Sequence, residues 1–322
     1  MHKWDFDEAI LSRIKQLEEK YEAMGQDLAS YLDGLLYADY LTYWDYIHLD
    51  ALLSLQNPRT NFADEPIFII YHQITELYFK LSITEMRQLI DGAPAPDEFL
   101  LRMKRINRYI MHLEDSFDIM IDGMDKEQFL RFRMSLLPAS GFQSGQYRII
   151  EILGTDFYNL VALDRRAQKQ TDAPIAELYE DIYWKFGATE LATGKKTLTL
   201  QHFEKKYSED FIRTGEEVRE TNLWKQYQRI VAEYGPQEEI VKELRSFDAL
   251  INVFWPLAHY KSAVRYLQKD PVDIAATGGT NWQKYLPPRF QKVIFYPELW
   301  TDEERESWGK QWVLKEVLKL KD

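Results

Sequence analysis

The alternation of apolar and polar residues predicts helices over most of the chain, most clearly in residues 65–80, EPIFIIYHQITELYFK. Their apolar side chains recur every three or four residues, which is the spacing of one helical face. This face comprises Ile67, Ile70, Tyr71, Ile74, Leu77, Tyr78 and Leu81. Pro66 suits a first helical turn because its missing N–H leaves no hydrogen bond unmade. We expect a helix that begins at Glu65 and is buried on most sides.

A narrower apolar seam runs from Asp7 to about Tyr37. Its members follow one another in alternating steps of four and three: Ile10, Ile14, Leu17, Tyr21, Met24, Leu28 and Tyr31. Such a seam is typical of helices that pair as in a coiled coil, and either an internal helix or another subunit can supply the partner. Gly25 weakens the middle of this helix by roughly 1 kcal/mol relative to alanine. We expect residues 1–37 to form a helical arm used in oligomerisation.

Helical patterns continue through residues 38–322, which we expect to form one all-α domain. Further helices are predicted at about 97–120, 125–136, 174–186, 237–255 and 297–319. Thr42 is expected to cap a short helix, and Pro256 to kink or interrupt the helix in which it lies. The alternation at Leu198–Leu200 is a short hint of a strand. The predicted fold class is therefore all-α.

Composition narrows the possible functions. Aromatic residues make up 14% of the chain, which suits a pocket for a flat apolar ligand or thick helix packing. The net charge of −12, without a basic stripe, argues against a nucleic-acid partner. The absence of cysteine excludes disulfides, iron–sulfur clusters and thiolate-bound haem. No apolar run approaches the roughly 18 residues of a membrane span, so we expect a soluble, cytoplasmic protein.

Two of the six histidines lie in patterns that suit a bound ligand. His72 is in line with Phe68 and Phe79 at the border of its helix, where it can aim at a ligand or reach for water. His259 has small neighbours, so a flat macrocycle could approach its helix with the imidazole as axial ligand. The same neighbours, Ala258, Ser262 and Ala263, also permit close packing of another helix. No histidine pair has the spacing of a zincin site, and no G-x-S-x-G elbow is present.

Arg133 and the loop Thr277–Thr280 are candidates for polar contacts with a ligand. Arg133 follows Phe129 and Phe132, and an arginine among aromatic side chains can clamp a carboxylate with two charge-assisted hydrogen bonds. More often, such an arginine pairs with an internal aspartate or glutamate. The loop reads Thr-Gly-Gly-Thr and can serve as a lid, a small polar clamp or a plain connection.

Six stretches carry a more specific pattern. They are Tyr43-x-x-Tyr46-x-x-Leu49-Asp50 with Leu52-Leu53 and Gln56-x-Pro58; Asp64-Glu65 with Phe68-Ile69-Ile70-x-His72-Gln73-x-x-Glu76-Leu77; Phe132-Arg133; Ser140-Gly141-Phe142-Gln143-Ser144-x-Gln146-Tyr147-Arg148; Trp255-x-x-x-His259; and Thr277-Gly278-Gly279. In their order and spacing, over roughly Tyr37–Leu286, the chain resembles the tryptophan 2,3-dioxygenase family, the haem enzymes of the kynurenine route. The SGFQSxQYR and HQxxEL motifs are specific to that family.

The resemblance implies an all-α fold of the tryptophan 2,3-dioxygenase and indoleamine dioxygenase type, with haem b (iron protoporphyrin IX) as cofactor. It implies that His259 is the axial ligand of the haem iron and that His72 is the distal catalytic histidine, which accepts the indole N–H. Arg133 then binds the substrate carboxylate and Thr277 its ammonium group, with Ser140 near a haem propionate. The walls of the substrate pocket are implied to be Phe68, Tyr43, Tyr46, Ile47, Leu136 and Tyr147.

The implied reaction inserts O2 across the indole C2–C3 bond of L-tryptophan to give N-formyl-L-kynurenine, the first step of tryptophan catabolism. The resemblance also implies a homotetramer, a dimer of dimers, in which an N-terminal segment with Tyr43 and Tyr46 completes a neighbour's active site. Two alternatives stay open: a related haem enzyme that acts on a substituted tryptophan or another indole amino acid, and a non-catalytic haem-binding sensor. Arg133 and Thr277 argue against the sensor, because gas sensing needs no amino-acid clamp.

Three departures from the family pattern bear on the substrate. Phe129 stands where the family usually offers a tyrosine hydroxyl to the carboxylate, and one lost hydrogen bond costs roughly 1–2 kcal/mol. Pro256-Leu257-Ala258 replaces a stretch that usually contains an arginine, and the segment from His259 to Thr277 is a few residues longer. These changes leave both histidines in place and the exact indole substrate open.

Overall fold

The computed structural model describes residues 7–38, 41–136, 141–189, 195–267, 291–309 and 312–313. The chain divides into two compact units, Met1–Asn57 and Pro58–Asp322. The described residues of both units are helical and contain no strand, only isolated bridges from Val161 to Ile182 and from Thr189 to Lys196. The prediction of an all-α fold is therefore confirmed.

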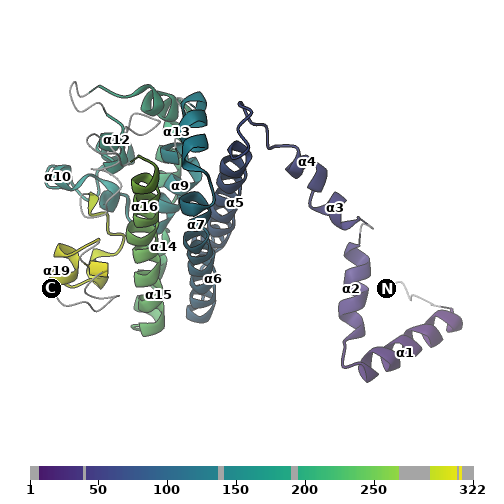
Figure 1. Ribbon diagram of the computed structural model, residues 1–322. Helices are drawn as coiled ribbons and strands as arrows, with labels where there is room; N and C mark the ends of the chain where they lie inside the picture. The colour runs from purple at the N-terminus through teal and green to yellow at the C-terminus, as the bar shows by residue number, and fades with distance from the viewer. Residues whose placement is uncertain are drawn as a thin grey trace. The chain divides into compact units, whose positions relative to one another are not determined.

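The N-terminal unit contains α1 (Glu8–Ala23), α2 (Leu28–Tyr37), α3 (Tyr43–Tyr46) and α4 (Leu49–Leu53) (Figure 1). The prediction of one helix from Asp7 to Tyr37 is wrong, because Gly25 adopts a φ of +68° after the end of α1. The Asp27 carboxylate then caps α2 by accepting a hydrogen bond from the backbone N–H of Ser30 at 3.1 Å. Thr42 caps α3, as predicted, and accepts from the N–H of Asp45 at 3.4 Å.

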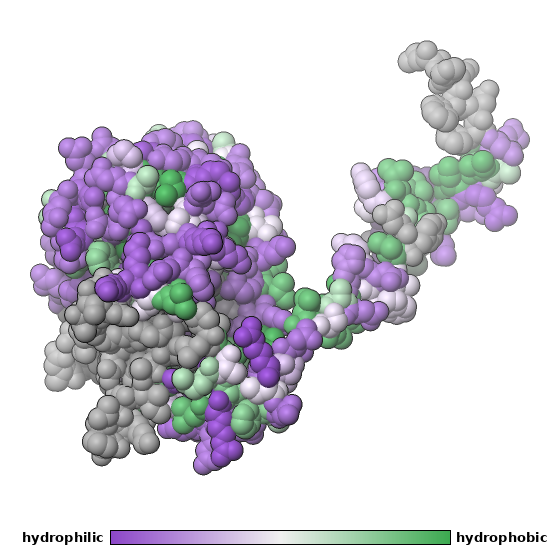
Figure 2. Space-filling view, turned by 90° about the horizontal axis from the view of Figure 1, so that it is seen from above, coloured by the Kyte–Doolittle hydropathy of each residue, from purple (hydrophilic) through white to green (hydrophobic). Residues whose placement is uncertain are grey.

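The four helices of the N-terminal unit bury none of their residues. Figure 2 shows apolar side chains on the surface of this unit, and they include Leu32, Leu35, Leu36 and Tyr37. The rings of Tyr21 and Tyr31 pack against each other with centroids 4.2 Å apart. A segment with this much exposed apolar surface has no core of its own and is expected to gain stability from a partner surface.

The second unit is a bundle of helices (Figure 1). Its described α-helices are α5 (Glu65–Ile90), α6 (Pro96–Asp115), α7 (Asp118–Asp122), α8 (Lys126–Phe132), α9 (Gly145–Gly154), α10 (Leu163–Arg166), α11 (Ile175–Glu180), α12 (Tyr183–Gly187), α13 (Leu198–Glu217), α14 (Leu223–Tyr234), α15 (Glu238–Ala249), α16 (Trp255–Leu267) and α19 (Asp302–Glu306). Helix α5 packs against α6 and α9, α6 packs against α15, and α9 packs against α13. A π turn, Leu250–Phe254, connects α15 directly to α16.

Helix α5 begins at Glu65 with Pro66 in its first turn, as predicted, but its buried face differs from the prediction. Ile70, Ile74, Leu77 and Leu81, which we call the α5 stripe, are 38–49% exposed. The buried face instead contains Tyr71, Thr75, Phe79, Ser82 and Met86. The hydroxyls of Thr75 and Ser82 donate to carbonyls of their own helix at 2.9 and 3.0 Å, so burying these polar groups leaves neither unpaired.

Several predicted helices are shorter than expected. The predicted helix 97–120 is divided into α6 and α7, and 174–186 is divided into α11 and α12. The hint of a strand at Leu198–Leu200 is wrong, because Thr197 caps α13 there and accepts from the N–H of Leu200 at 3.2 Å. In the described part of 297–319, a 3₁₀ turn at Pro297–Leu299 precedes α19.

A cluster of three tryptophans packs beside the main core. The rings of Trp300, Trp308 and Trp312 have centroids 4.8–5.6 Å apart, and they contact Val253 of the π turn. The indole N–H of Trp300 donates to the buried Asp248 carboxylate at 2.9 Å, which joins the cluster to α15. None of the described helices has the length and apolar character that crossing a membrane requires.

Candidate functional site

His259 projects from the second turn of α16 and is held by two aromatic rings. Its imidazole centroid lies 4.5 Å from the Trp255 ring and 4.5 Å from the Phe117 ring. Its Nδ1 lies 3.1 Å from the carbonyl oxygen of Trp255. Because a carbonyl can only accept, Nδ1 carries the hydrogen and Nε2 keeps its lone pair. The site therefore presents a fixed imidazole in the tautomer that can bind a metal through Nε2.

The surroundings of His259 keep its imidazole neutral. Burial is the main cause that lowers the pKa of His259 to about 4, and repulsion from Arg148, or from His72 when His72 is protonated, acts in the same direction. The hydrogen bond to the Trp255 carbonyl acts in the opposite direction and is outweighed. At neutral pH the imidazole is therefore unprotonated, which is the form that binds metal ions.

His72, on α5, repeats this arrangement. Its ring packs on Phe68, one turn earlier, with centroids 4.1 Å apart, and Nδ1 lies 2.7 Å from the Phe68 carbonyl oxygen. By the same reasoning Nδ1 carries the hydrogen and Nε2 is the acceptor. Burial lowers the pKa of His72, so this imidazole is also neutral at neutral pH.

The two histidines are far apart in sequence but belong to one aromatic cluster. Phe117, which packs on His259, lies edge-on to Tyr71 with centroids 5.8 Å apart, and Tyr71 in turn contacts the His72 ring at 6.2 Å. Phe117 and Tyr71 therefore connect the two imidazoles through ring contacts. Helices α5 and α16 thus bring together two imidazoles, each with an Nε2 that can accept or coordinate.

Arg133 lies beside this cluster, in the 3₁₀ turn Arg133–Leu136 that follows α8. Its side chain is buried, and burial lowers the pKa of its guanidinium. The preceding residue, Phe132, packs edge-on to Phe68 with centroids 6.0 Å apart. Leu136, at the end of the same turn, packs against the main core. The structure thus places Arg133 directly after a ring that packs on Phe68, the neighbour of His72, and it places Leu136 against the main core.

Hydrogen bonds fix the start of α8 against the start of α5. The Asp64 carboxylate accepts from the N–H of Asp125 at 2.6 Å, and the N–H of Asp64 donates to the Gln128 side chain at 3.3 Å. The Glu65 carboxylate accepts from the N–H of Arg59 at 2.8 Å, which holds the chain that enters α5. These bonds set the position of the Arg133 turn relative to the helix that carries His72.

Tyr147 lies on α9. The three residues of the QYR motif, Gln146, Tyr147 and Arg148, make contacts that hold α9 against neighbouring elements. The ring of Tyr147 packs on Phe79 with centroids 5.5 Å apart, and its hydroxyl donates to the Ile251 carbonyl at 2.9 Å. Gln146 donates to the backbone carbonyl of Glu76 at 2.8 Å, one turn beyond His72.

The third residue of the motif, Arg148, is buried and donates to Glu151 and to the Tyr183 hydroxyl, both at 2.9 Å. Its guanidinium also lies 5.1 Å from the centre of the Tyr147 ring, so it supports the same pocket wall.

The remaining residues of the predicted site belong to the N-terminal unit or lie outside the described residues. Tyr43 and Tyr46 belong to α3 of the N-terminal unit and are 71% and 74% exposed, and Ile47 follows them at the end of that helix. Ser140 and Thr277 lie outside the described residues. Among the described side chains, no three histidine, aspartate or glutamate residues converge on a metal-ion position.

The small residues around His259 serve helix packing in at least one case. The hydroxyl of Ser262 donates to the carbonyl of Met120 in α7 at 3.2 Å. Tyr266, one turn further, donates to the carbonyl of Ile121 at 3.1 Å. These hydrogen bonds hold α7 against this side of α16.

Phe117 is the residue of this cluster that sequence analysis did not single out. Its spacing marked it only as one apolar position of a predicted long helix. The chain turns there instead, between α6 and α7, and this turn directs the ring at His259. No local pattern distinguishes such a position from an ordinary core residue.

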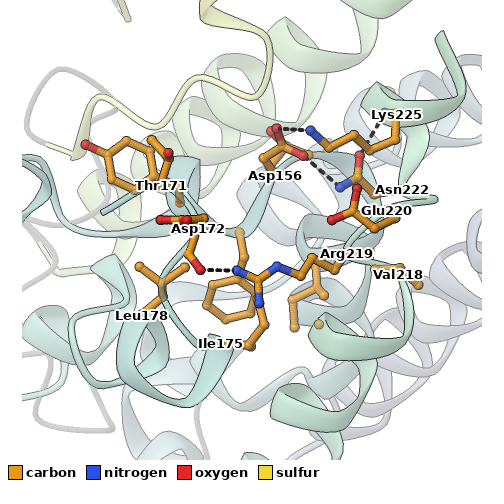
Figure 3. A pocket seen from close by; sticks show the side chains of 15 residues that line it. Asp156, Thr171, Asp172, Ile175, Leu178, Val218, Arg219, Glu220, Asn222 and Lys225 are labelled. Atoms are coloured by element: carbon orange, nitrogen blue, oxygen red, sulfur yellow. Dashed lines mark hydrogen bonds and ion pairs between the residues drawn. The ribbon is translucent and has the colours of Figure 1, made fainter. Parts of the chain in front are cut away.

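A pocket of about 260 Å³ lies elsewhere in the second unit, among α9, α11, α13 and α14 (Figure 3). Asp156 accepts from Asn222 at 3.0 Å and pairs with Lys225 at 3.1 Å. Arg219 donates to the carbonyl oxygen of Asp172. Neither of the two histidines lines this pocket, and several of its charged groups are already paired with one another.

Comparison with known proteins supplies an independent line of evidence. A family model described as tryptophan 2,3-dioxygenase matches residues 36–254. The tryptophan 2,3-dioxygenase of Bradyrhizobium diazoefficiens is 31% identical over 272 residues, which cover 81% of this chain and 91% of that protein. The tryptophan 2,3-dioxygenase of Ruegeria sp. (strain TM1040) is 28% identical, over 82% of this chain and 92% of that protein. That of Bordetella pertussis is 26% identical, over 88% of this chain and 96% of that protein.

Proposed function

Because the chain belongs to the tryptophan 2,3-dioxygenase family, we propose that it is a haem-dependent dioxygenase that converts L-tryptophan and O2 to N-formyl-L-kynurenine. The observation that carries the proposal is the pair of neutral imidazoles, His72 and His259, in one aromatic cluster. Each has its Nδ1 hydrogen bonded to its own helix, which leaves Nε2 for another partner.

These residues fit a haem group. His259 would hold the group, because it supplies an unprotonated nitrogen on a ring that Trp255 and Phe117 keep in place. The hydrogen bond to the Trp255 carbonyl orients the ring in the way that outer partners commonly orient metal-bound histidines. When bound, haem supplies the redox chemistry that O2 needs in order to react with an indole ring.

The chain's own residues bind and orient the substrate. His72 accepts the indole N–H at Nε2, and its low pKa keeps that acceptor unprotonated. Arg133 binds the carboxylate with two charge-assisted hydrogen bonds, and burial strengthens this contact by excluding water. Phe68, Leu136 and Tyr147 form apolar walls around the indole. Holding the reactants in one geometry accounts for a large part of such catalysis.

Further groups complete the proposed site. Thr277 binds the substrate ammonium and Ser140 contacts a haem propionate. Tyr43, Tyr46 and Ile47 reach the site of a neighbouring subunit, and the exposure of the two tyrosines supports this.

The apolar α5 stripe also supports assembly, because a contiguous exposed apolar face typically marks a subunit contact. The proposed assembly is a homotetramer in the cytoplasm.

One observation favours a second candidate, a haem enzyme of this family that acts on a substituted tryptophan. Phe129 offers no hydroxyl to the substrate carboxylate, and the ring next to it, Tyr266, has a centroid 4.6 Å away. The Tyr266 hydroxyl already donates to the carbonyls of Ile121 and Met124, so it does not replace the missing group. With a weaker contact to the substrate carboxylate, the choice between substrates depends more on how the indole ring and its substituents fit the pocket.

Product analysis separates the two candidates. The purified protein is supplied with ¹⁸O2 and, in parallel reactions, with L-tryptophan or a ring-substituted tryptophan. We expect N-formyl-L-kynurenine with both oxygen atoms of one O2 molecule, and faster turnover of L-tryptophan. Faster turnover of the substituted substrate would favour the second candidate, and a product without inserted oxygen would exclude the proposed dioxygenase reaction.

A further inference from the structure

The helix that carries His259 begins with an irregular turn. The N–H of Trp255 donates to the carbonyl of Leu250, five residues earlier, so residues 250–254 form a π turn instead of an α-helical one. Pro256 follows immediately. A proline ring inside an α-helix clashes with the carbonyl four residues before it, and the wider π turn relieves this clash.

Because of this arrangement, the Ile251 carbonyl oxygen receives neither of the two backbone N–H groups that could bond to it in a regular α-helix or π-helix. In α-helical register the donor is the N–H of Trp255, which is bonded to Leu250 instead. In π register the donor is the N–H of residue 256, and proline has none. Ile251 is fully buried, and a buried carbonyl without a donor is costly. The hydroxyl of Tyr147 donates to this oxygen at 2.9 Å.

We infer that the Tyr147 hydroxyl takes the place of the N–H that Pro256 lacks, and so holds the turn from which the His259 helix emerges. Tyr147 can do this because its backbone N–H is capped by Ser144 at 3.2 Å and its ring packs on Phe79. The side-chain amide of the next residue of the turn, Asn252, donates to the Asp248 carboxylate at 2.8 Å. Tyr147 is thus a positioning residue as well as a wall of the proposed pocket.

A double-mutant cycle tests the inference. The four proteins are the unchanged chain, Tyr147→Phe, Pro256→Ala and the double variant, and the readout is the unfolding equilibrium constant from denaturant titration. Tyr147→Phe alone should raise this constant about tenfold or more, because it removes only the hydroxyl that serves a buried carbonyl. In the Pro256→Ala background the backbone can again supply a donor. There the same substitution should raise the constant less than about threefold.

Two further variants keep the test decisive. Pro256→Leu and Pro256→Ala both restore the backbone N–H but differ in side-chain size, so both replacements must give the same rescue. Either can complete the cycle if the other fails to fold. Tyr158→Phe removes a hydroxyl that donates to the Arg166 carbonyl at 3.0 Å, away from the π turn. Its effect should be the same with Pro256 and with Ala at that position.

An equal effect of Tyr147→Phe in both backgrounds would overturn the inference. The readout does not depend on haem or substrate. A failure of this cycle is therefore distinct from a failure of the proposed function.

Discussion

The ring of Phe117 packs on the ring of His259, with centroids 4.5 Å apart and an interplanar angle of 52°. Phe117 is buried at the turn between α6 and α7, and its ring also packs edge-on to Tyr71 of α5. A single phenylalanine therefore connects the helices of both histidines. The orientation of the His259 imidazole depends on this ring as well as on the backbone of α16.

Replacement of Phe117 by alanine should lower both stability and haem affinity. The lost packing should cost about 3–5 kcal/mol in the free energy of unfolding, and His259 should gain rotational freedom. Denaturant titration and haem titration followed by Soret absorbance measure the two effects. Phe211→Ala is the matched control, because Phe211 is equally buried among Trp184, Phe203 and Tyr207. The account is wrong on this point if both variants lose haem affinity equally.

Replacement of Arg133 by leucine should raise the KM for L-tryptophan far more than it lowers haem content. A buried carboxylate that loses its charged partner costs roughly 3–5 kcal/mol, so kcat/KM should fall by about a hundredfold or more. Arg131→Leu changes the same residue type at an exposed position of α8 and should leave both quantities nearly unchanged. Equal losses of haem and of substrate affinity in Arg133→Leu would count against its role as the carboxylate clamp.

Asp248 should make stability depend on pH. Burial raises its pKa to about 6, against the hydrogen bonds it accepts from Phe295, Asn252, Trp300 and Tyr296. Because the folded pKa is above the unfolded one, this group stabilises the fold most at low pH, and that contribution is lost as pH rises through 6.

The destabilisation caused by Asp248→Asn should therefore grow by roughly 1 kcal/mol between pH 7 and pH 5. Denaturant titrations of both proteins at the two pH values measure this difference. A pH-independent difference would show that the carboxyl does not titrate in this range.

Replacement of Leu77 by glutamate should break the proposed tetramer. A charge at the centre of the α5 stripe would have to be desolvated in the subunit contact. Light scattering should give a smaller mass than for the unchanged chain. Leu101→Glu places the same charge at an exposed position of α6, outside the stripe, and should keep the mass of the unchanged chain. If Leu77→Glu also keeps that mass, the stripe is not the contact.

Sequence patterns predicted the start of α5 at Glu65 and the all-α fold, because proline placement and apolar spacing act locally. They misassigned the buried face of α5. Thr75 and Ser82 pair their hydroxyls within the helix, and a pattern based on hydropathy treats such residues as polar. The turn at Gly25 was seen only as a weak point, since spacing alone does not show that the residue adopts a positive φ.

The candidate site was predictable where a family motif carried it and was not predictable elsewhere. His72, Arg133, Tyr147 and His259 lie in such motifs. The ring of Phe117 and the π turn before Pro256 depend on contacts between helices distant in sequence, which no local pattern encodes. The tautomers of the histidines likewise follow from hydrogen bonds to carbonyls one helical turn away.

The central claim is that His259 holds haem and His72 holds the indole. The most direct measurement is the absorption spectrum of the purified protein, ferric and then ferrous with L-tryptophan and O2, for the unchanged chain, His259→Ala and His72→Ala. We predict a Soret band and N-formyl-L-kynurenine formation for the unchanged chain, no Soret band for His259→Ala, and an intact Soret band with slower product formation for His72→Ala. A Soret band that survives unaltered in His259→Ala would contradict the account.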